Sequence, residues 1–230
     1  MQSAETTQDH QAASPLEALR TRYLAAQLSG DRREAVRLVL EEGLHRGHAV
    51  SELQAEVIQS AQQKIGELWQ QNRISIAQEH MATAISHVVL ARLFEEAPPA
   101  ISNGKRVVVA CVEGELHEFP ARLVADFLEL AGYQVRYLGA NVPLHDLVKL
   151  LAAEPTDLLA LSVTMSFNAG ALHRGVERIR AEFPSLPILV GGHALSWEPE
   201  LATRFGVQTC GAGSAAVLDA ARRLTAKAVA

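Results

Sequence analysis

Beyond residue 104 the chain alternates between short apolar runs and amphipathic segments, and few folds accommodate this alternation. The apolar runs predict buried strands, and the segments between them have the spacing of helices. The predicted strands are 106–112, 134–138, 158–163, 187–190 and a weaker 207–210, with a last helix from about 214 to 227. Strands that are apolar on both faces, with helices between them, indicate a parallel sheet covered on both sides.

Five strands of this kind fit an α/β fold with a flavodoxin-like sheet of order 2-1-3-4-5. The segment before them has helical periodicity and almost no strand signal. We therefore expect a flavodoxin-like domain over residues 105–230, preceded by an all-α domain, a four-helix bundle over 15–97. The composition of 98–104, with two prolines and a glycine, predicts a linker. The polar residues 1–14 predict a disordered tail.

Capping residues predict where the helices of the bundle begin. Ser14 precedes a proline and has the character of an N-cap. Ser51 with Gln54, and Ser75 with Gln78, have the spacing of capping boxes. The predicted helices run from about Pro15 to Leu28, from Asp31 to about Gly47, from Ser51 through Leu68, and from Ser75 through Phe94.

Charge and cysteine content argue against several function classes. The net charge is −5, both signs are mixed and there is no basic arm, which disfavours direct binding of nucleic acid. No apolar run approaches the roughly 20 residues of a membrane span, and the polar N-terminus lacks the apolar core of a signal peptide. Cys111 and Cys210 make no disulfide framework, and Cys111 is expected to be a buried thiol. These features favour a cytoplasmic protein.

The loop after the first predicted strand, residues 115–120, presents a histidine where open α/β sheets bind their ligands. Imidazole is a common metal ligand, and a carboxylate two residues away, Glu115, can fix the tautomer of His117. A single loop histidine is more often simply solvated. His117 is therefore a stronger candidate ligand if the ends of the other predicted strands also carry residues suited to bind a ligand.

Hydroxyls and glycines end the third and fourth predicted strands. Ser162 and Thr164 alternate with apolar residues, and hydroxyls in such a place either cap a turn or hydrogen-bond a ligand. Gly191 and Gly192 either make a turn or let a flat ligand approach the backbone closely. His193 follows the glycine pair directly, so we expect it to line the same pocket.

Together these strand ends resemble the cobalamin-binding domain of methionine synthase, the mutases and their relatives. The pattern of that family is Asp-x-His-x-x-Gly, then Ser-x-Leu or Ser-x-Thr, then Gly-Gly. In this chain the three motifs read Glu115-Leu116-His117-Glu118-Phe119-Pro120, Ser162-Val163-Thr164 and Gly191-Gly192. The first motif departs twice, because Glu115 replaces the aspartate and Pro120 stands at the glycine. Pro120 suits the first turn of a helix.

The resemblance implies a role for each of these residues. His117 would bind cobalt from below and displace the dimethylbenzimidazole base of the cofactor. The nucleotide tail would then enter the sheet beside the first, third and fourth strands. Ser162 would hydrogen-bond the buried base with Thr164 nearby, and Gly191 and Gly192 would leave room for the tail.

The helical part carries a second signal in Trp69 and the pair Glu79-His80. Taken alone, these are interpreted as a core tryptophan and as charges at a helix N-terminus. Their spacing, Trp-x9-Glu-His, resembles the CarH type of repressor, which senses light and depends on adenosylcobalamin. The resemblance implies that the bundle caps the upper face of the corrin, with Trp69 over the adenosyl group and Glu79, with His80 beside it, helping to hold it. Such repressors carry an N-terminal DNA-binding domain, and we expect this chain to be the sensor half alone.

The resemblance thus implies a cobalamin-binding photoreceptor or sensor module, with adenosylcobalamin as the expected cofactor. Such a module would regulate a partner or transcription through a changed conformation or oligomeric state, without being an enzyme. Its expected partner is a second copy of the chain or a separate regulatory protein, and not nucleic acid or a membrane. The alternative is a corrinoid carrier protein for methyl transfer, which shares the plan of bundle and sheet. A module for another tetrapyrrole or a free corrinoid is a further alternative, and a catalytic mutase is disfavoured.

Overall fold

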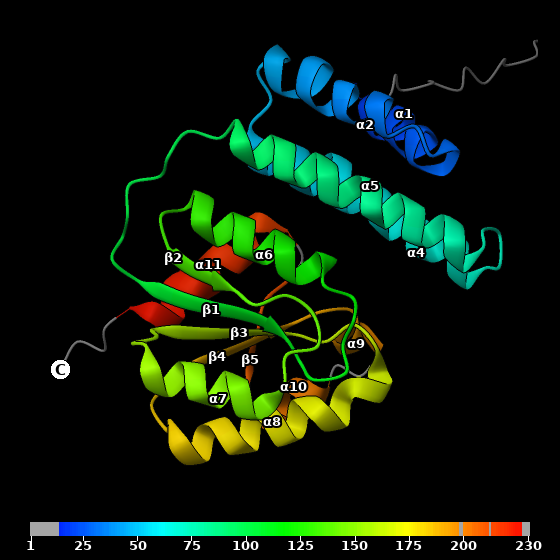
Figure 1. Ribbon diagram of the computed structural model, residues 1–230. Coiled ribbons are helices and arrows are strands. Elements are labelled where there is room, and N and C mark those ends of the chain that lie inside the picture. The colour runs from blue at the N-terminus through cyan, green and yellow to red at the C-terminus, as the bar shows by residue number, and fades with distance from the viewer. Residues whose placement is uncertain (1–13, 198–199, 212, 227–230) are drawn as a thin grey trace, which may run out of the picture. The chain divides into compact units, whose positions relative to one another are not determined.

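The computed structural model describes residues 14–197, 200–211 and 213–226 (Figure 1). Most of the predicted tail, residues 1–13, lies outside the described residues. The chain divides into two compact units, one up to Glu95 and one from Glu96 onward. We call them the helical unit and the α/β unit.

The helical unit consists of four helical stretches, two of which contain π-helical turns within the described residues. Its elements are α1 (Pro15–Ser29), α2 (Arg32–Arg37), η1 (Leu38–Gly43), η2 (Leu44–Arg46), α3 (Val50–Glu52), η3 (Leu53–Gln59), α4 (Ser60–Gln70) and α5 (Ile76–Glu95). The π-helical turns are η1 and η3, and η2 is a 3₁₀ turn. The α1 helix packs against η1, η3, α4 and α5. The largest side chains of this core are Tyr23, Leu38, Leu53, Ile58, Ile65, Leu90 and Leu93.

Two of the predicted helix starts are confirmed. The Ser14 side chain accepts a hydrogen bond of 3.2 Å from the Glu17 amide. At the start of α5 the Ser75 amide donates to Gln78 Oε1 at 2.9 Å, and the Gln78 amide donates to Ser75 Oγ at 3.3 Å. This reciprocal pair is a capping box, and it fixes where the chain enters α5.

The predicted capping box at Ser51 is wrong. The helix begins one residue earlier, at Val50, and Ala49 occupies the N-cap position without a side-chain bond. Ser51 is therefore already inside the first turn. Gln54 is completely buried, so the core and not the helix start determines its place. The second predicted helix is also less regular than its pattern indicates, because α2 passes into η1 and η2.

The α/β unit is a five-stranded parallel sheet of order β2-β1-β3-β4-β5. This order and the all-α region before it confirm the predicted fold class. The strands are β1 (Arg106–Cys111), β2 (Gln134–Tyr137), β3 (Leu158–Ser162), β4 (Ile188–Gly191) and β5 (Gln208–Thr209). The helices are α6 (Phe119–Leu130), α7 (Leu144–Ala153), η4 (Ser166–Asn168), α8 (Ala169–Glu182), α9 (Ala194–Trp197), α10 (Glu200–Phe205) and α11 (Ser214–Thr225).

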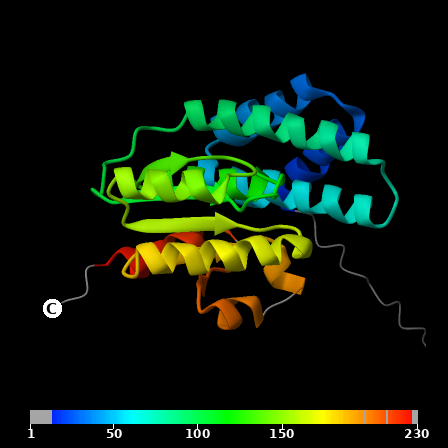
Figure 2. The same cartoon turned by 60° about the horizontal axis from the view of Figure 1, so that its bottom comes forward.

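Helices cover both faces of this sheet (Figure 1). On one face α6 and α11 pack on β1 and β3. On the other, α7 and α8 enclose the alternate strand residues in one apolar core, and Figure 2 shows α8 running alongside β3. The central strand β3 is buried along its whole length, which is why its sequence is a continuous apolar run.

Residues 98–104, which were predicted to be a linker, belong to the α/β unit. The Asn103 amide donates to the Gly132 carbonyl at 2.9 Å. Gly132 has a φ of 88°, and a Cβ there would lie 2.2 Å from the Ile101 carbonyl oxygen. A side chain at position 132 would therefore displace this segment.

None of the helices in the described ranges is long and apolar enough to cross a bilayer.

Candidate functional site

A buried carboxylate organises the end of β1. Glu115 is 0 % exposed. Its Oε1 accepts hydrogen bonds from the His117 amide at 2.9 Å and from His117 Nδ1 at 2.6 Å. Its Oε2 accepts from the amides of Thr164 and Met165 and from Asn168 Nδ2, each at 2.9 Å. One carboxylate thus joins the loop after β1 to the loop after β3.

These donors keep Glu115 ionised. Burial alone raises the pKa of the carboxyl, but the bonds from the His117 ring and from the surrounding amides outweigh it and lower the pKa to about 2. Because an ionised carboxylate can only accept, His117 Nδ1 carries a proton, and the neutral form of the ring has its lone pair on Nε2. A carboxylate that accepts a hydrogen bond from one ring nitrogen in this way orients the imidazole so that the other nitrogen can bind a metal. The His117 side chain is 46 % exposed, so the ring is accessible from solvent.

The loop after β2 supports the same strand end. Asn141 Oδ1 accepts from the Gly114 amide, and the Asn141 amide donates to the Glu115 carbonyl, both at 2.8 Å. Asn141 has a φ of 50°, a left-handed conformation that asparagine tolerates. Asn141, Met165 and Asn168 were not among the residues predicted from sequence, although all three hold the candidate ligand loop.

Two exposed large apolar side chains lie in the two loops that Glu115 joins. Leu116 lies next to His117, and Phe167 lies between the Glu115-bonded residues Met165 and Asn168. Both side chains are exposed. Each of the two loops that Glu115 joins thus presents one exposed apolar side chain, a composition that suits a ligand with apolar surface better than it suits a hydrated ion.

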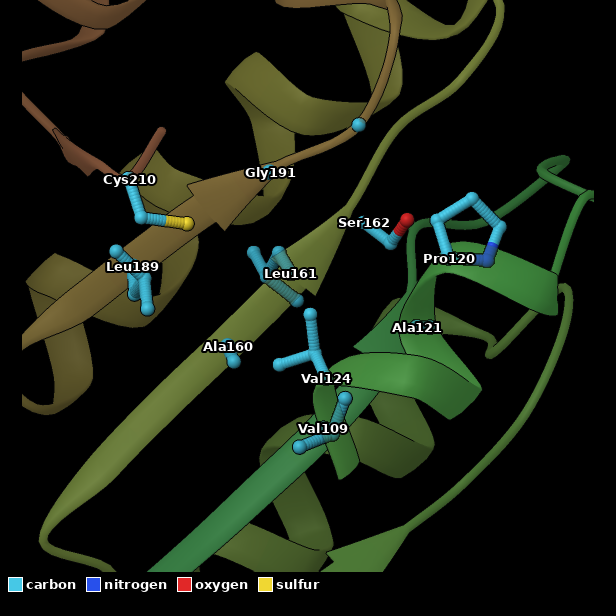
Figure 3. A pocket seen from close by; sticks show the side chains of 11 residues that line it. Val109, Pro120, Ala121, Val124, Ala160, Leu161, Ser162, Leu189, Gly191 and Cys210 are labelled. Atoms are coloured by element: carbon cyan, nitrogen blue, oxygen red, sulfur yellow. The ribbon is translucent and has the colours of Figure 1, made fainter. Parts of the chain in front are cut away.

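A small cavity lies on the face of the sheet that α6 covers, with a volume of about 30 Å³. Pro120 and Val124 of α6 form one wall, and Ser162, Gly191 and Cys210 lie across from them. Figure 3 shows Ser162 beside Pro120 at one end, and Cys210 at the other. Such a volume holds roughly two water molecules.

The hydroxyls that the sequence singled out are buried without nitrogen or oxygen partners in the described structure. These are Ser162 Oγ, beside the Cys111 thiol of the neighbouring strand, and Thr164 Oγ1. Cys111 is the predicted buried thiol, and burial raises its pKa to about 12. The Cys111 thiol is the partner that remains for the Ser162 hydroxyl, and a thiol is a weak one, so burial of this hydroxyl still costs free energy. The Ser162 hydroxyl, at the edge of a cavity, is therefore suited to donate to a ligand.

Gly191 and Gly192 have different structural roles. A Cβ on Gly191 would meet nothing within 4 Å, so this residue leaves space beside the cavity. Gly192 has a φ of 112°, and a Cβ there would lie 2.1 Å from the Val163 carbonyl oxygen. Glycine is thus required at 192 by the close approach of two backbones. His193 is exposed and is not among the residues that line this cavity, so its expected place beside the nucleotide tail stays a prediction.

In the helical unit, the predicted residues lie around the loop between α4 and α5. Trp69 is half-buried near the end of α4. In the first turn of α5, Glu79 Oε2 lies 2.6 Å from His80 Nδ1, and Glu79 Oε1 accepts a 2.7 Å bond from Thr83 Oγ1. The Glu79 side chain is 19 % exposed and that of His80 is 71 % exposed. Glu79 and His80 are thus paired at the surface.

The chemistry of the α/β unit fits a metal that arrives inside a macrocycle. Among the residues that the structure describes, no three His, Cys, Asp or Glu side chains cluster to hold a metal ion by themselves. One oriented imidazole suffices for a metal whose remaining positions are already filled. Ser162 and Gly191 offer a donor and space for a heterocyclic base. The cavity is smaller than such a base, which could enter only if the walls moved apart.

Comparison with known proteins indicates that the domains of this chain are of the cobalamin-binding type. A family model described as a B12 binding domain matches residues 105–221, and a second model of that description matches residues 19–93. The chain is 31 % identical over 144 residues to the HTH-type transcriptional repressor CarH of Myxococcus xanthus, which covers 62 % of this chain and 48 % of that protein. It is 24 % identical over 133 residues to dimethylamine corrinoid protein 3 of Methanosarcina acetivorans, covering 53 % of this chain and 62 % of the relative.

The chain spans about half the length of the curated repressors that it matches. Among solved structures, the monomethylamine corrinoid protein of Methanosarcina barkeri superimposes with a TM-score of 0.75. The superposition covers 90 % of this chain and 98 % of that one at 19 % identity, so it shows a shared fold. The fold, the strand-end motifs and the matched models agree, and the chain belongs to the B12-binding domain family.

Proposed function

We propose that this chain binds adenosylcobalamin and serves as a sensor module that responds to light or to the state of the cofactor. The observation that carries the binding proposal is the Glu115 carboxylate, which holds the proton of His117 on Nδ1. His117 is proposed as the lower ligand of cobalt, through Nε2. Ser162 is proposed to donate to the displaced base.

The bound cofactor would supply a cobalt–carbon bond that light can break. The protein residues would do the rest: Glu115 orients the imidazole, and the sheet and α6 shield the nucleotide tail from water. Thr164 supports this arrangement through its backbone, because its amide is committed to Glu115. Gly191 and Gly192 are proposed to border the tail.

The sensor proposal is supported by the helical unit. Trp69 offers a half-buried aromatic surface, and Glu79 with His80 offers a polar pair at the start of α5. These groups suit an upper ligand that combines a flat base with hydroxyls, as an adenosyl group does. Loss of such a ligand would remove a large contact from the bundle and change any interface built on it. The output is proposed to be a changed oligomeric state or a changed contact with a regulatory protein in the cytoplasm.

The second candidate function is that of a corrinoid carrier subunit in a methyltransferase system. It is favoured by the relatives named dimethylamine corrinoid proteins and by the shared fold of the monomethylamine corrinoid protein. A carrier must expose a small methyl group to partner enzymes. It therefore gains nothing from groups that select a large upper ligand.

One reconstitution experiment distinguishes the sensor function from the carrier function. The protein is loaded in the dark with adenosyl-, methyl- or hydroxocobalamin, and its spectrum and hydrodynamic size are measured before and after green light. The sensor proposal predicts tightest retention of adenosylcobalamin and a light-dependent change in size for that form alone. Equal retention of all three forms, with no change in size, would reject the sensor and favour the carrier.

A further inference from the structure

A row of polar side chains starts in the core of the helical unit, at the buried Tyr23 and Ser86, and continues through the half-buried Gln62 and Thr83 to Glu79. The Tyr23 hydroxyl of α1 lies 3.0 Å from Ser86 Oγ of α5. Ser86 Oγ lies 3.1 Å from Gln62 Oε1 of α4. Gln62 Nε2 lies 2.5 Å from Thr83 Oγ1, which lies 2.7 Å from Glu79 Oε1. Three helices thus contribute to one continuous chain of hydrogen bonds.

The direction of this chain follows from the chemistry of its two ends. The Glu79 carboxylate can only accept, so Thr83 donates to it. Thr83 has then used its single proton and accepts from the amide nitrogen of Gln62. The Gln62 oxygen accepts from Ser86, which in turn accepts from Tyr23. Burial raises the pKa of Tyr23, which keeps this first donor protonated.

A side branch ties the same chain to α1 a second time. Gln27 Nε2 donates to Ser86 Oγ at 2.8 Å and to the Ala82 carbonyl at 3.2 Å. Gln27 is completely buried, and its Oε1 has no partner in the described structure. A network with an unsatisfied group is a poorer source of stability than apolar packing would be. The main effect of this network is instead to fix the orientation of the Glu79 carboxylate.

Glu79 is therefore held from the interior and presented at the surface. Its Oε1 accepts a hydrogen bond from the half-buried Thr83, and its Oε2 lies beside the exposed His80. We propose that Thr83, Gln62 and Tyr23 are positioning residues for the upper ligand, which hold Glu79 ready to accept a hydrogen bond from a ligand hydroxyl. This inference rests on the proposed function. It adds a route by which a change at Glu79 reaches the packing of α1, α4 and α5.

Thr83→Val tests the proposal, because it keeps the shape of the side chain and removes the hydroxyl. Dissociation constants for adenosylcobalamin and hydroxocobalamin are measured in the dark, and their ratio is the readout. One lost hydrogen bond predicts that the preference for adenosylcobalamin falls about fivefold to tenfold. Thr83→Ser restores the hydroxyl and is expected to keep the preference of the unmodified protein.

Thr21→Val is the matched control. Its hydroxyl bonds the Glu17 carbonyl within the exposed face of α1, so no change in the ratio is expected. Gln62→Met breaks the next link and repeats the test if Thr83→Val fails to fold. Tyr23→Phe removes the first donor and is expected to lower the preference about twofold, since Gln27 still donates to Ser86.

An unchanged ratio in folded Thr83→Val or Gln62→Met would overturn the proposal, and so would an equal fall in Thr83→Ser. An unmodified protein that binds neither cobalamin would instead refute the proposed function, so the two failures are distinguishable.

Discussion

The two units position their candidate residues by different means. In the α/β unit, Glu115 is held by backbone amides and one side-chain amide from the ends of two neighbouring strands. In the helical unit, Glu79 is held by a relay of side chains drawn from three helices. Amides are fixed by the topology of the sheet, whereas a relay depends on every side chain in it. We therefore expect the α/β unit to treat all cobalamins alike and the helical unit to distinguish their upper ligands.

The largest expected effect is the loss of stability when the Glu115 carboxylate is removed. Glu115→Ala leaves several buried donors unpaired, and each costs about 1–3 kcal/mol. We expect the free energy of unfolding, measured with urea, to fall by about 3 kcal/mol or more. Glu113→Ala removes an exposed carboxylate two residues away and should stay within about 0.5 kcal/mol of the unmodified protein. A similar small loss for Glu115→Ala would mean that the strand ends do not depend on this group.

Low pH should remove the contribution that Glu115 makes to the free energy of unfolding. The pKa of Glu115 is about 2 in the folded protein and lies below its ordinary value. Its contribution is therefore complete above about pH 4.5 and is lost as the pH falls toward 2. Urea titrations across this window should show a decline that is shallower in Glu115→Gln. Identical pH profiles for the two proteins would contradict the depressed pKa.

Ser162→Ala sharpens the comparison, because its effect should be independent of the upper ligand. Loss of the donor to a buried base should weaken binding by about 1–3 kcal/mol, which is about fivefold to 150-fold. Adenosyl- and hydroxocobalamin should be affected equally. Ser166→Ala, at an exposed hydroxyl in η4, serves as the control. An effect on only one of the two cofactors would contradict the expectation that the α/β unit treats all cobalamins alike.

Trp69→Ala should show the opposite behaviour. If the indole packs on the upper ligand, its removal should cost adenosylcobalamin about 0.5–1.5 kcal/mol more than hydroxocobalamin. Glu79→Gln should act in the same direction but more weakly. Competition assays in the dark give both values, with the exposed neighbour Gln70→Ala as control. Equal losses for the two cofactors would make Trp69 purely structural.

The fold and the α/β site were largely predictable because their signals are local. A strand buried on both faces must be apolar throughout, so β3 was visible in the sequence. The bond from His117 to Glu115 spans two residues. The donors from Met165 and Asn168 lie 50 and 53 residues from Glu115. They could not be predicted, because only the β1–β3 pairing brings them there.

The helical unit was harder to predict in detail. The Ser75–Gln78 box was visible because it lies within one turn. Tyr23, Gln62 and Ser86 are ordinary polar residues in the sequence, and nothing in their spacing predicts a shared network. Their contacts span up to 63 residues and depend on how the helices pack. The π-helical turns also shift the register that a regular helical pattern assumes.

The central claim is that His117 is the lower ligand of cobalt, and electron paramagnetic resonance of the Co(II) form tests it most directly. An axial nitrogen splits the cobalt lines into triplets, and the heavy isotope of nitrogen converts them into doublets. In protein grown with heavy-isotope histidine, we predict doublets, and a return to triplets or to unsplit lines in His117→Ala. Triplets that persist in the labelled protein would show that the cofactor base remains on cobalt and would contradict the account.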